Sequence, residues 1–262
     1  AFSIYPSGWI ESTVANGMRT AEGLEHPIGT GPYMMGGWKR GESITLTANP
    51  DYWGGMPAVQ TLVIRWEADF ATRLADLQAG IVDGIDNVRP GDYETVRRDP
   101  LLSLLERPTR DSLNLDIPSL FASLPNTAHE PSAVAYRADV IHPQASPLGY
   151  ELFYLSAPGD RDVFVWIQTT EPSSLFCADV AEGDALRVCA QAVESLYAYE
   201  INGTTVKPAL AESCAPNADL TVWVCALRQD VAVTGGSTFD AFDVVATFNR
   251  GLNIGSPFHA GH

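Results

Sequence analysis

Short apolar runs broken by turn-forming residues dominate the first third of the chain, and this pattern predicts β-strands. The expected strands cover residues 1–5, 32–38, 43–49 and 61–66. After them, Phe70, Leu74 and Leu77 recur on one helical face, so we expect a helix that ends at Gly80. A strand, a polar helix and another strand follow at residues 82–88, 91–99 and 101–108. This alternation predicts an α/β fold.

The last hundred residues carry equally clear patterns. β-Forming runs predict strands at residues 162–168 and 220–228. Between these strands, residues 183–200 show helical periodicity. The apolar face of this expected helix consists of Leu186, Cys189, Val193, Leu196 and Tyr197.

A second helix is expected near the end of the printed sequence, over residues 237–251. Serine, threonine and aspartate at its beginning are typical capping residues, and Gly251 is expected to end it. Its apolar side chains Phe242, Val245 and Phe248 are expected to face the core.

The middle of the chain has a weaker pattern. Residues 108–132 are rich in proline, serine and asparagine without clear periodicity, so we expect an irregular connection there. Extended pieces are expected after it, at residues 133–147 and 151–160. We therefore divide the chain into residues 1–107, a connecting part at 108–160 and residues 161–262, all within one globular domain.

Composition narrows the class of protein. An apolar content of 45% with 18% charged residues is typical of a folded soluble domain. The formal net charge of −16 disfavours nucleic-acid binding and suits a secreted protein. No window approaches 18 uninterrupted apolar residues, so no membrane span is expected. The first residues lack a basic and then apolar leader pattern, so a signal peptide is expected to be absent or already removed.

The four cysteines, Cys177, Cys189, Cys214 and Cys225, allow three pairings. We favour the local pairs 177 with 189 and 214 with 225, because turn residues and alternation between Cys214 and Cys225 predict a hairpin. Four buried free thiols are the alternative. Disulfides would place the chain outside the reducing cytosol.

Candidate catalytic and metal-binding groups are few. The glycines of residues 29–37 match no dinucleotide or phosphate motif, and Pro32 before β-formers predicts a turn leading into a strand. The five histidines are scattered, no nucleophile motif is present, and the Asn202 sequon is better explained as a hairpin turn. We expect no enzyme activity, no metal and no cofactor.

Aromatic residues next to glycines or at expected helix ends are candidates for the lining of a ligand cleft, although core packing is the default for at least half of them. They are Trp38, Tyr52, Trp53, Tyr197 and Tyr199.

Two blocks of the sequence resemble one known family. The first block resembles the extracellular solute-binding proteins of the peptide/nickel ABC-importer family, family 5. It consists of residues 26–57, HPIGTGPYMMGGWKRGESITLTANPDYWGGMP, and residues 65–86, RWEADFATRLADLQAGIVDGID. The second block, with EPSSL, PALAESC and FDAFDVV, is similar to the amino-terminal region of that family. Together the blocks cover about 200 of the 262 residues. The resemblance implies an α/β, periplasmic-binding-protein-like lobe with mixed β-sheets and flanking helices.

Three departures qualify the resemblance. The EPSSL block precedes the GTGPY block in the family and follows it here, which implies a circularly permuted order. The second lobe of the family would lie where residues 108–132 form only a short connection. At residues 231–236, VAVTGG stands where the family has VKFHDG.

The resemblance also implies a function. We expect a solute-binding module, truncated or engineered to a single lobe, which binds a small solute or short peptide; a redesigned scaffold without native binding, or with a newly engineered activity, is the alternative. The expected partner in the parent family is an ABC permease, and the chain is expected to be monomeric and periplasmic or extracellular. The residues implied to contact the ligand are Glu171, Pro172, Ser173, Tyr197, Tyr33 and Trp38.

Overall fold

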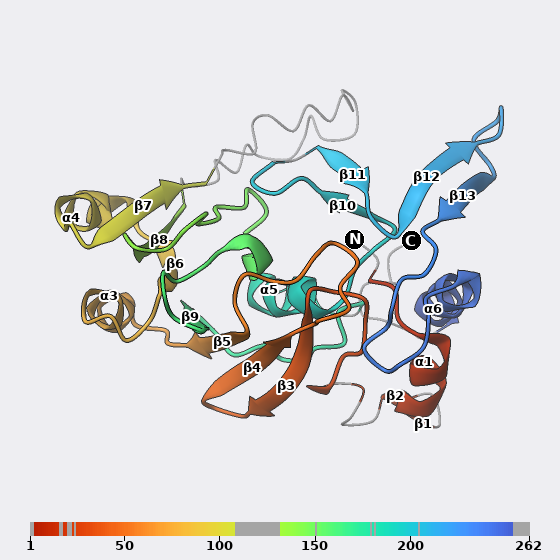
Figure 1. The fold of residues 1–262 in the computed structure, drawn as a ribbon, viewed down its shortest axis with the longest axis horizontal. Coiled ribbons are helices and arrows are strands. Elements are labelled where there is room, and N and C mark those ends of the chain that lie inside the picture. Colours follow the sequence, from red (N-terminus) through yellow and green to blue (C-terminus); the bar gives the residue numbers. More distant parts are fainter. Residues whose placement is uncertain are drawn as a thin grey trace, which may run out of the picture.

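The computed structural model describes residues 3–15, 18–19, 23, 25–107, 132–149, 151–178, 180, 182–203 and 205–253. Its centre is a mixed seven-stranded sheet (Figure 1). In spatial order the strands are β3 (Tyr33–Lys39), β4 (Ser43–Ala48), β5 (Thr61–Trp66), β9 (Val163–Gln168), β6 (Gly84–Val88), β8 (Ala133–Arg137) and β7 (Leu102–Glu106).

Helices and small hairpins surround this sheet. The helices are α1 (Ser7–Thr13), α3 (Phe70–Gln78), α4 (Tyr93–Arg98), α5 (Gly183–Ala192) and α6 (Ala241–Asn253), with 3-10 turns η1 (Pro90–Asp92) and η3 (Phe153–Leu155). Three two-stranded pairs complete the described structure: β1 (Val14–Ala15) with β2 (Met18–Arg19), β10 (Tyr197–Tyr199) with β11 (Val206–Pro208), and β12 (Ala211–Pro216) with β13 (Trp223–Leu227). None of the described helices has the length and apolar character needed to cross a bilayer.

Strand β9 joins distant parts of the chain. It pairs in parallel with β5 on one side and with β6 on the other, so that Val165 lies opposite Val63 and Trp166 opposite Gly84. A Cβ atom on Gly84 would lie 2.6 Å from Cζ3 of Trp166, so only glycine fits beside this indole. A strand from the last hundred residues is therefore central to a sheet built mainly from the first 107.

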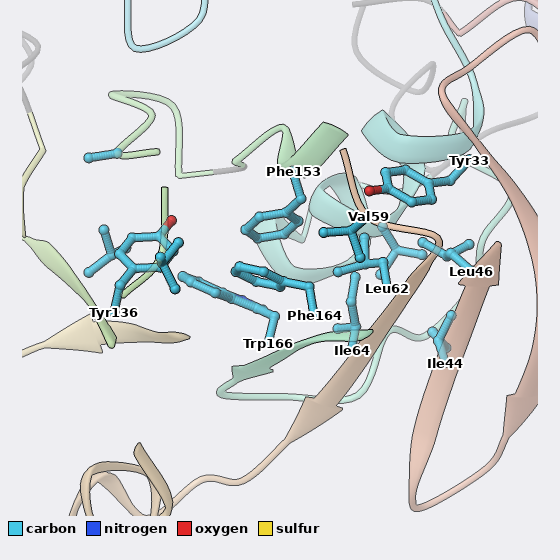
Figure 2. Close-up of a cluster of buried hydrophobic side chains, with 14 of the residues drawn as sticks. Tyr33, Ile44, Leu46, Val59, Leu62, Ile64, Tyr136, Phe153, Phe164 and Trp166 are labelled. Atoms are coloured by element: carbon cyan, nitrogen blue, oxygen red, sulfur yellow. The ribbon is translucent and has the colours of Figure 1, made fainter. Parts of the chain in front are cut away.

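The two faces of β9 pack into different layers. Phe164 and Trp166 enter the larger apolar cluster together with Phe153 and Tyr136 (Figure 2). The rings of Phe153 and Trp166 lie 5.0 Å apart. Val188 brings α5 onto this face of the sheet.

On the opposite face, Ile167 joins a second apolar cluster. Phe70 and Leu77 of α3 and Val96 of α4 supply its helical side. The periodicity of Phe70, Leu74 and Leu77 thus produces a helix that covers the sheet, with Asp69 as its N-cap accepting a hydrogen bond from the Thr72 amide.

The GTGPY stretch lies against the end of α5. Cβ atoms on Gly29 and Gly31 would stand 2.5 and 2.6 Å from backbone atoms of residues 191 and 192. The Gly31 amide donates to the Ala192 carbonyl at 3.1 Å. The glycines therefore permit close backbone approach, which agrees with the structural role expected from the sequence.

The amino-terminal segment packs on α6. The Tyr5 amide donates to Thr247 Oγ1 at 3.0 Å, and the Ser7 amide donates to Asp243 Oδ1 at 2.8 Å. Tyr5, Trp9 and Phe176 stack in one aromatic cluster, with the rings of Tyr5 and Phe176 5.0 Å apart. Both ends of the described chain therefore contribute to the same layer.

Most expected elements are confirmed, and the fold is α/β. The expected strand over residues 1–5 is wrong where the structure describes it, because residues 3–6 are irregular and lead into α1. The expected extended piece at 151–160 contains η3 instead. Residues 108–131 lie outside the described residues, and the domain boundaries stay a prediction.

Two expected helices differ in detail. Helix α5 ends at Ala192, because Val193 is extended, so Leu196 and Tyr197 lie beyond the helix. In α6 the expected inward face is wrong: Phe242 is 76% exposed and Val245 55% exposed, while Asp243 and Thr247 are buried. These two polar side chains are buried because they bind the amides of Ser7 and Tyr5.

The structure contains the two disulfides that the sequence favoured. Cys177 joins Cys189 of α5, and both are buried in the cluster that holds Tyr5. Cys214 and Cys225 are opposed residues in the β12–β13 hairpin. The described cysteines thus leave no free thiol.

Replacing Cys177 and Cys189 together with alanine is expected to lower the free energy of unfolding by about 2–4 kcal/mol, as loss of a short closed loop does. The Cys214 and Cys225 pair closes a loop of nearly equal span, 11 residues against 12, but is only partly buried. Its loss should cost less, since little packing is lost with it. Urea denaturation of the two double variants measures the difference. A larger loss for the hairpin pair would contradict this account.

Candidate functional site

Three of the residues implied by the resemblance lie in the loop after β9. The Glu171 carboxylate accepts a hydrogen bond from Trp38 Nε1 at 2.9 Å and from the Gly41 amide at 3.2 Å. Pro172 is buried, and Ser173 is exposed and donates to Glu182 at 2.9 Å. Glu171 and Trp38 are therefore brought together, at the tip of the β3–β4 hairpin.

The other two implied residues lie apart from that loop. Tyr33 is fully buried in the main core, as Figure 2 shows, and burial raises the pKa of its phenol well above the usual range. Tyr197 begins β10 and does not lie at a helix end as expected. Ligand contact by these residues stays a prediction.

The structure contains a cavity of about 560 Å³ elsewhere. It lies between the end of α5, the β10–β11 hairpin, the loop at residues 52–53 and the segment at residues 144–154. None of the six implied residues lines it. Three of the aromatic candidates do, namely Tyr52, Trp53 and Tyr199.

Glu194 lies in the wall of this cavity, just after α5. Its Oε2 accepts hydrogen bonds from Thr30 Oγ1 and from Trp53 Nε1, each at 2.8 Å. Its Oε1 accepts from the Tyr52 hydroxyl at 3.1 Å. Burial raises the pKa of the Glu194 carboxyl, although these three donors act in the opposite direction.

Three aromatic side chains, Tyr52, Trp53 and Tyr154, lie close together in the same wall. Tyr52 contacts Tyr154 edge to face, with centroids 5.8 Å apart, and lies beside Trp53 at 5.6 Å. The guanidinium of Arg228 lies over the ring of Trp53, 4.1 Å from the ring centroid. Burial, and then the nearby Glu194 charge, raise the pKa of Tyr52 above its usual range, so this hydroxyl stays protonated and remains a donor.

A buried network of ion pairs is centred on Glu151, which is one of the residues that line the cavity. Its Oε1 accepts from Arg107 Nη2 at 2.7 Å and its Oε2 from Arg187 Nε at 2.9 Å. Both arginines also bind Asp86. Burial alone would lower the pKa of Arg187, but the carboxylates of Asp86 and Glu151 raise it above the usual range. This network links β6 and the end of β7 to α5.

The described residues include no cluster of histidine, cysteine or carboxylate side chains suited to a metal ion. Asn202 has a left-handed φ of 58° in the β10–β11 turn, consistent with the turn expected there. Its Oδ1 accepts a hydrogen bond from the Ala145 amide at 2.8 Å and so closes one side of the cavity.

Sequence reasoning did not find Glu194 or Glu151. Glu194 follows a helix that the pattern extended too far, which made it one polar residue on a helical surface. Thr30 and Trp53 reach Glu194 only because the segment that contains GTGPY packs against the end of α5 in the folded chain. One signal was available: the Pro-Asp-Tyr-Trp run beside glycines marked an aromatic loop.

Residues 1–119 match the model of a family described as bacterial extracellular solute-binding proteins, family 5, middle region. The matched part is 119 of the 262 residues, so this part of the chain is similar to the middle region of that family.

Among curated proteins, the chain is 32% identical over 105 residues to Di/tripeptide-binding protein 2 of Pseudomonas aeruginosa, covering 40% of this chain and 18% of that protein. It is 35% identical over 106 residues to Heme-binding protein A of Haemophilus influenzae, covering 40% and 19%. Both relatives are named as binding proteins. The chain thus spans less than a fifth of the length of these relatives.

Two solved structures are also similar to part of the chain. HbpA2 from Haemophilus parasuis is 32% identical with a TM-score of 0.36, covering 40% of this chain and 20% of that one. AgaA from A. tumefaciens R10, in complex with agropinic acid, is 31% identical with a TM-score of 0.35, covering 39% and 20%.

Proposed function

We propose that this chain binds a small solute or short peptide in the cavity beside Glu194, as a module of the family 5 solute-binding type. The cavity supports this proposal most directly. Its volume of about 560 Å³ lies within the range of small-molecule sites, about 300–1,000 Å³. Aromatic walls with a few fixed polar groups are also typical of such sites.

The composition of the cavity wall adds to this support. Tyr52 and Trp53 come from the matched family segment, while Glu194 comes from the second block of the sequence. Hydrogen bonds between them fix the wall before any ligand arrives. A preformed wall of this kind reduces the ordering cost of binding.

We further propose that residues 1–107 and 161–262 are two halves of one lobe, joined in the reverse of the family order. The position of β9 between β5 and β6 supports this arrangement. Residues 108–131 are too few to form a second lobe of ordinary domain size. This lobe tested by itself would leave much of a ligand in water, so for the printed chain we expect dissociation constants near the millimolar range.

The similarity to family 5 proteins also suggests a cellular location and a partner. We propose that it acts outside the cytoplasm as a monomer, and that an ABC permease receives its solute. Two disulfides fit an oxidising compartment.

Calorimetric titration with di- and tripeptides tests the binding proposal, and a cavity-filling variant locates the site. Ala198 lines the cavity and is exposed, so A198W is expected to weaken binding at least about tenfold by occupying that space. The matched control A226W places the same side chain on an exposed position of β13, outside the cavity, and should leave binding unchanged. Absence of heat with every peptide, or equal loss in both variants, would refute the proposal.

A further inference from the structure

A buried acceptor atom in the cavity wall has no hydrogen-bond partner among the described residues. Several buried side-chain nitrogen and oxygen atoms lack such a partner, and of these atoms only Gln144 Oε1 belongs to a residue that lines the cavity. Gln144 is only 5% exposed. A buried acceptor without a donor is unfavourable, so a solute that brings a donor to this atom gains binding free energy.

The backbone of Gln144 is held in place by the core. The Tyr136 hydroxyl donates to the Gln144 carbonyl at 2.5 Å and accepts from the Gln144 amide at 3.3 Å. Tyr136 is fully buried in the larger apolar cluster. The amide of the next residue, Ala145, donates to Asn202 Oδ1 at 2.8 Å. Gln144 therefore has a fixed position in the wall, next to the turn of the β10–β11 hairpin.

The side-chain amide of Gln144 has one favourable orientation. Its Nε2 donates to the His142 carbonyl at 2.9 Å, and Ser156 Oγ donates to the same carbonyl at 2.9 Å. Turning the amide over would place Oε1 against the carbonyl oxygen, and two acceptors do not form a hydrogen bond. Nε2 is thus engaged by the backbone, and Oε1 is the side of the amide that a solute can use.

The rest of the wall indicates which kind of donor suits this atom. Glu151 is neutralised by two arginines, and Glu194 already accepts hydrogen bonds from three neutral donors. Much of the remaining lining is apolar and includes Leu148 and Leu152. A neutral N–H is the best match for a neutral acceptor in such a wall, because no charge has to leave water to reach it.

We infer that Gln144 is a specificity-determining residue of the cavity, and that its Oε1 accepts a hydrogen bond from a backbone amide N–H of a bound peptide. The inference rests on the proposed solute-binding function and names the group of the solute that this residue recognises. A peptide amide is neutral and is flanked by side chains that can pack on the apolar lining. The last torsion of a glutamine side chain is soft, so a small rotation directs Oε1 to the donor.

Peptides in which an ester replaces one amide test the inference. Trialanine is compared with its two ester analogues, in each of which an oxygen atom takes the place of one N–H group. Heteronuclear NMR titration of the wild-type protein at pH 7 measures the dissociation constants, since this method resolves weak binding. We expect one of the two analogues to bind at least about tenfold more weakly than trialanine, because its ester oxygen faces Oε1 as a second acceptor.

Two variants identify the residue responsible. Q144M keeps a side chain of similar length without the amide oxygen, so it should bind trialanine and the weaker ester with affinities within about twofold of each other. Q229M is the matched control. Gln229 Nε2 donates to the Leu227 carbonyl at 2.9 Å, the same contact to the second residue before it that Gln144 makes, but Gln229 is exposed and lies outside the cavity lining. Q229M should therefore keep the wild-type preference.

The outcomes separate this inference from the proposed function. Equal binding of trialanine and both esters to the wild-type protein overturns the inference and leaves solute binding intact. This comparison needs no variant, so it stands even where Q144M folds poorly. A preference that persists in folded Q144M overturns the role of Gln144. Absence of binding by trialanine, the esters and the wider peptide set overturns both proposals together.

Discussion

Replacing Arg187 with methionine is expected to lower the free energy of unfolding by about 3–5 kcal/mol, the typical cost of removing one partner from a buried ion pair. The Arg187 side chain is only 1% exposed, and its guanidinium binds Asp86 and Glu151, which are 3% and 0% exposed. Methionine fills a similar volume but leaves these two carboxylates with Arg107 as their one ion-pair partner among the described residues. Since whole domains are stable by about 5–15 kcal/mol, this single change threatens the folded state.

The matched control is R98M in α4. Arg98 is 82% exposed and reaches Glu94 only at 3.9 Å, so solvent screens the pair and its loss should cost less than about 0.5 kcal/mol. Urea denaturation followed by far-UV circular dichroism measures both variants. A loss of unfolding free energy below about 1 kcal/mol for R187M would show that these ion pairs contribute little to holding α5 against β6.

The sequence predicted the main sheet well because its signals are local. Strands such as β5 and β9 carry runs of β-branched and aromatic residues, and α3 has both a capping aspartate and a terminal glycine. The pairing of Cys214 with Cys225 followed from the turn residues between them. These features depend on neighbours in sequence, so one chain is enough to recognise them.

The errors arise where a distant segment decides the outcome. The apolar stripe of α6 predicted Phe242 and Val245 inside, but hydrogen bonds from Ser7 and Tyr5 turn Asp243 and Thr247 inward. A hydrophobic pattern contains no information about those amide partners.

The candidate site was predictable only in part, for the same reason. The aromatic loop was visible as Tyr52 and Trp53 beside glycines. Glu194 gains its position from Thr30, which is 164 residues away, and Glu151 gains its two arginine partners from the end of β7 and from α5. Polar residues that share no local motif become a site only when the sheet order is known.

The order of the sheet itself is tested by W166A, for which we expect a loss of about 3–5 kcal/mol in the free energy of unfolding, as for other buried aromatic residues. Trp166 is fully buried and contacts Phe153 and Tyr136, with centroids 5.0 and 5.4 Å away (Figure 2). Alanine would leave a cavity beside Gly84, which has no side chain to fill it. Thermal and urea unfolding measure the loss.

W223A is the matched control, because Trp223 is 59% exposed on β13 and its removal should change stability by less than about 0.5 kcal/mol.

W166A should also weaken the Arg187 network, since the guanidinium lies 5.5 Å from the centroid of the indole ring. The double variant R187M/W166A should therefore lose less unfolding free energy than the sum of the two single losses. If β9 instead belonged to a separate globule, W166A would leave a second unfolding transition unchanged. A single transition shifted throughout is the result that a shared sheet requires, because strands before residue 107 and after residue 161 then unfold as one unit.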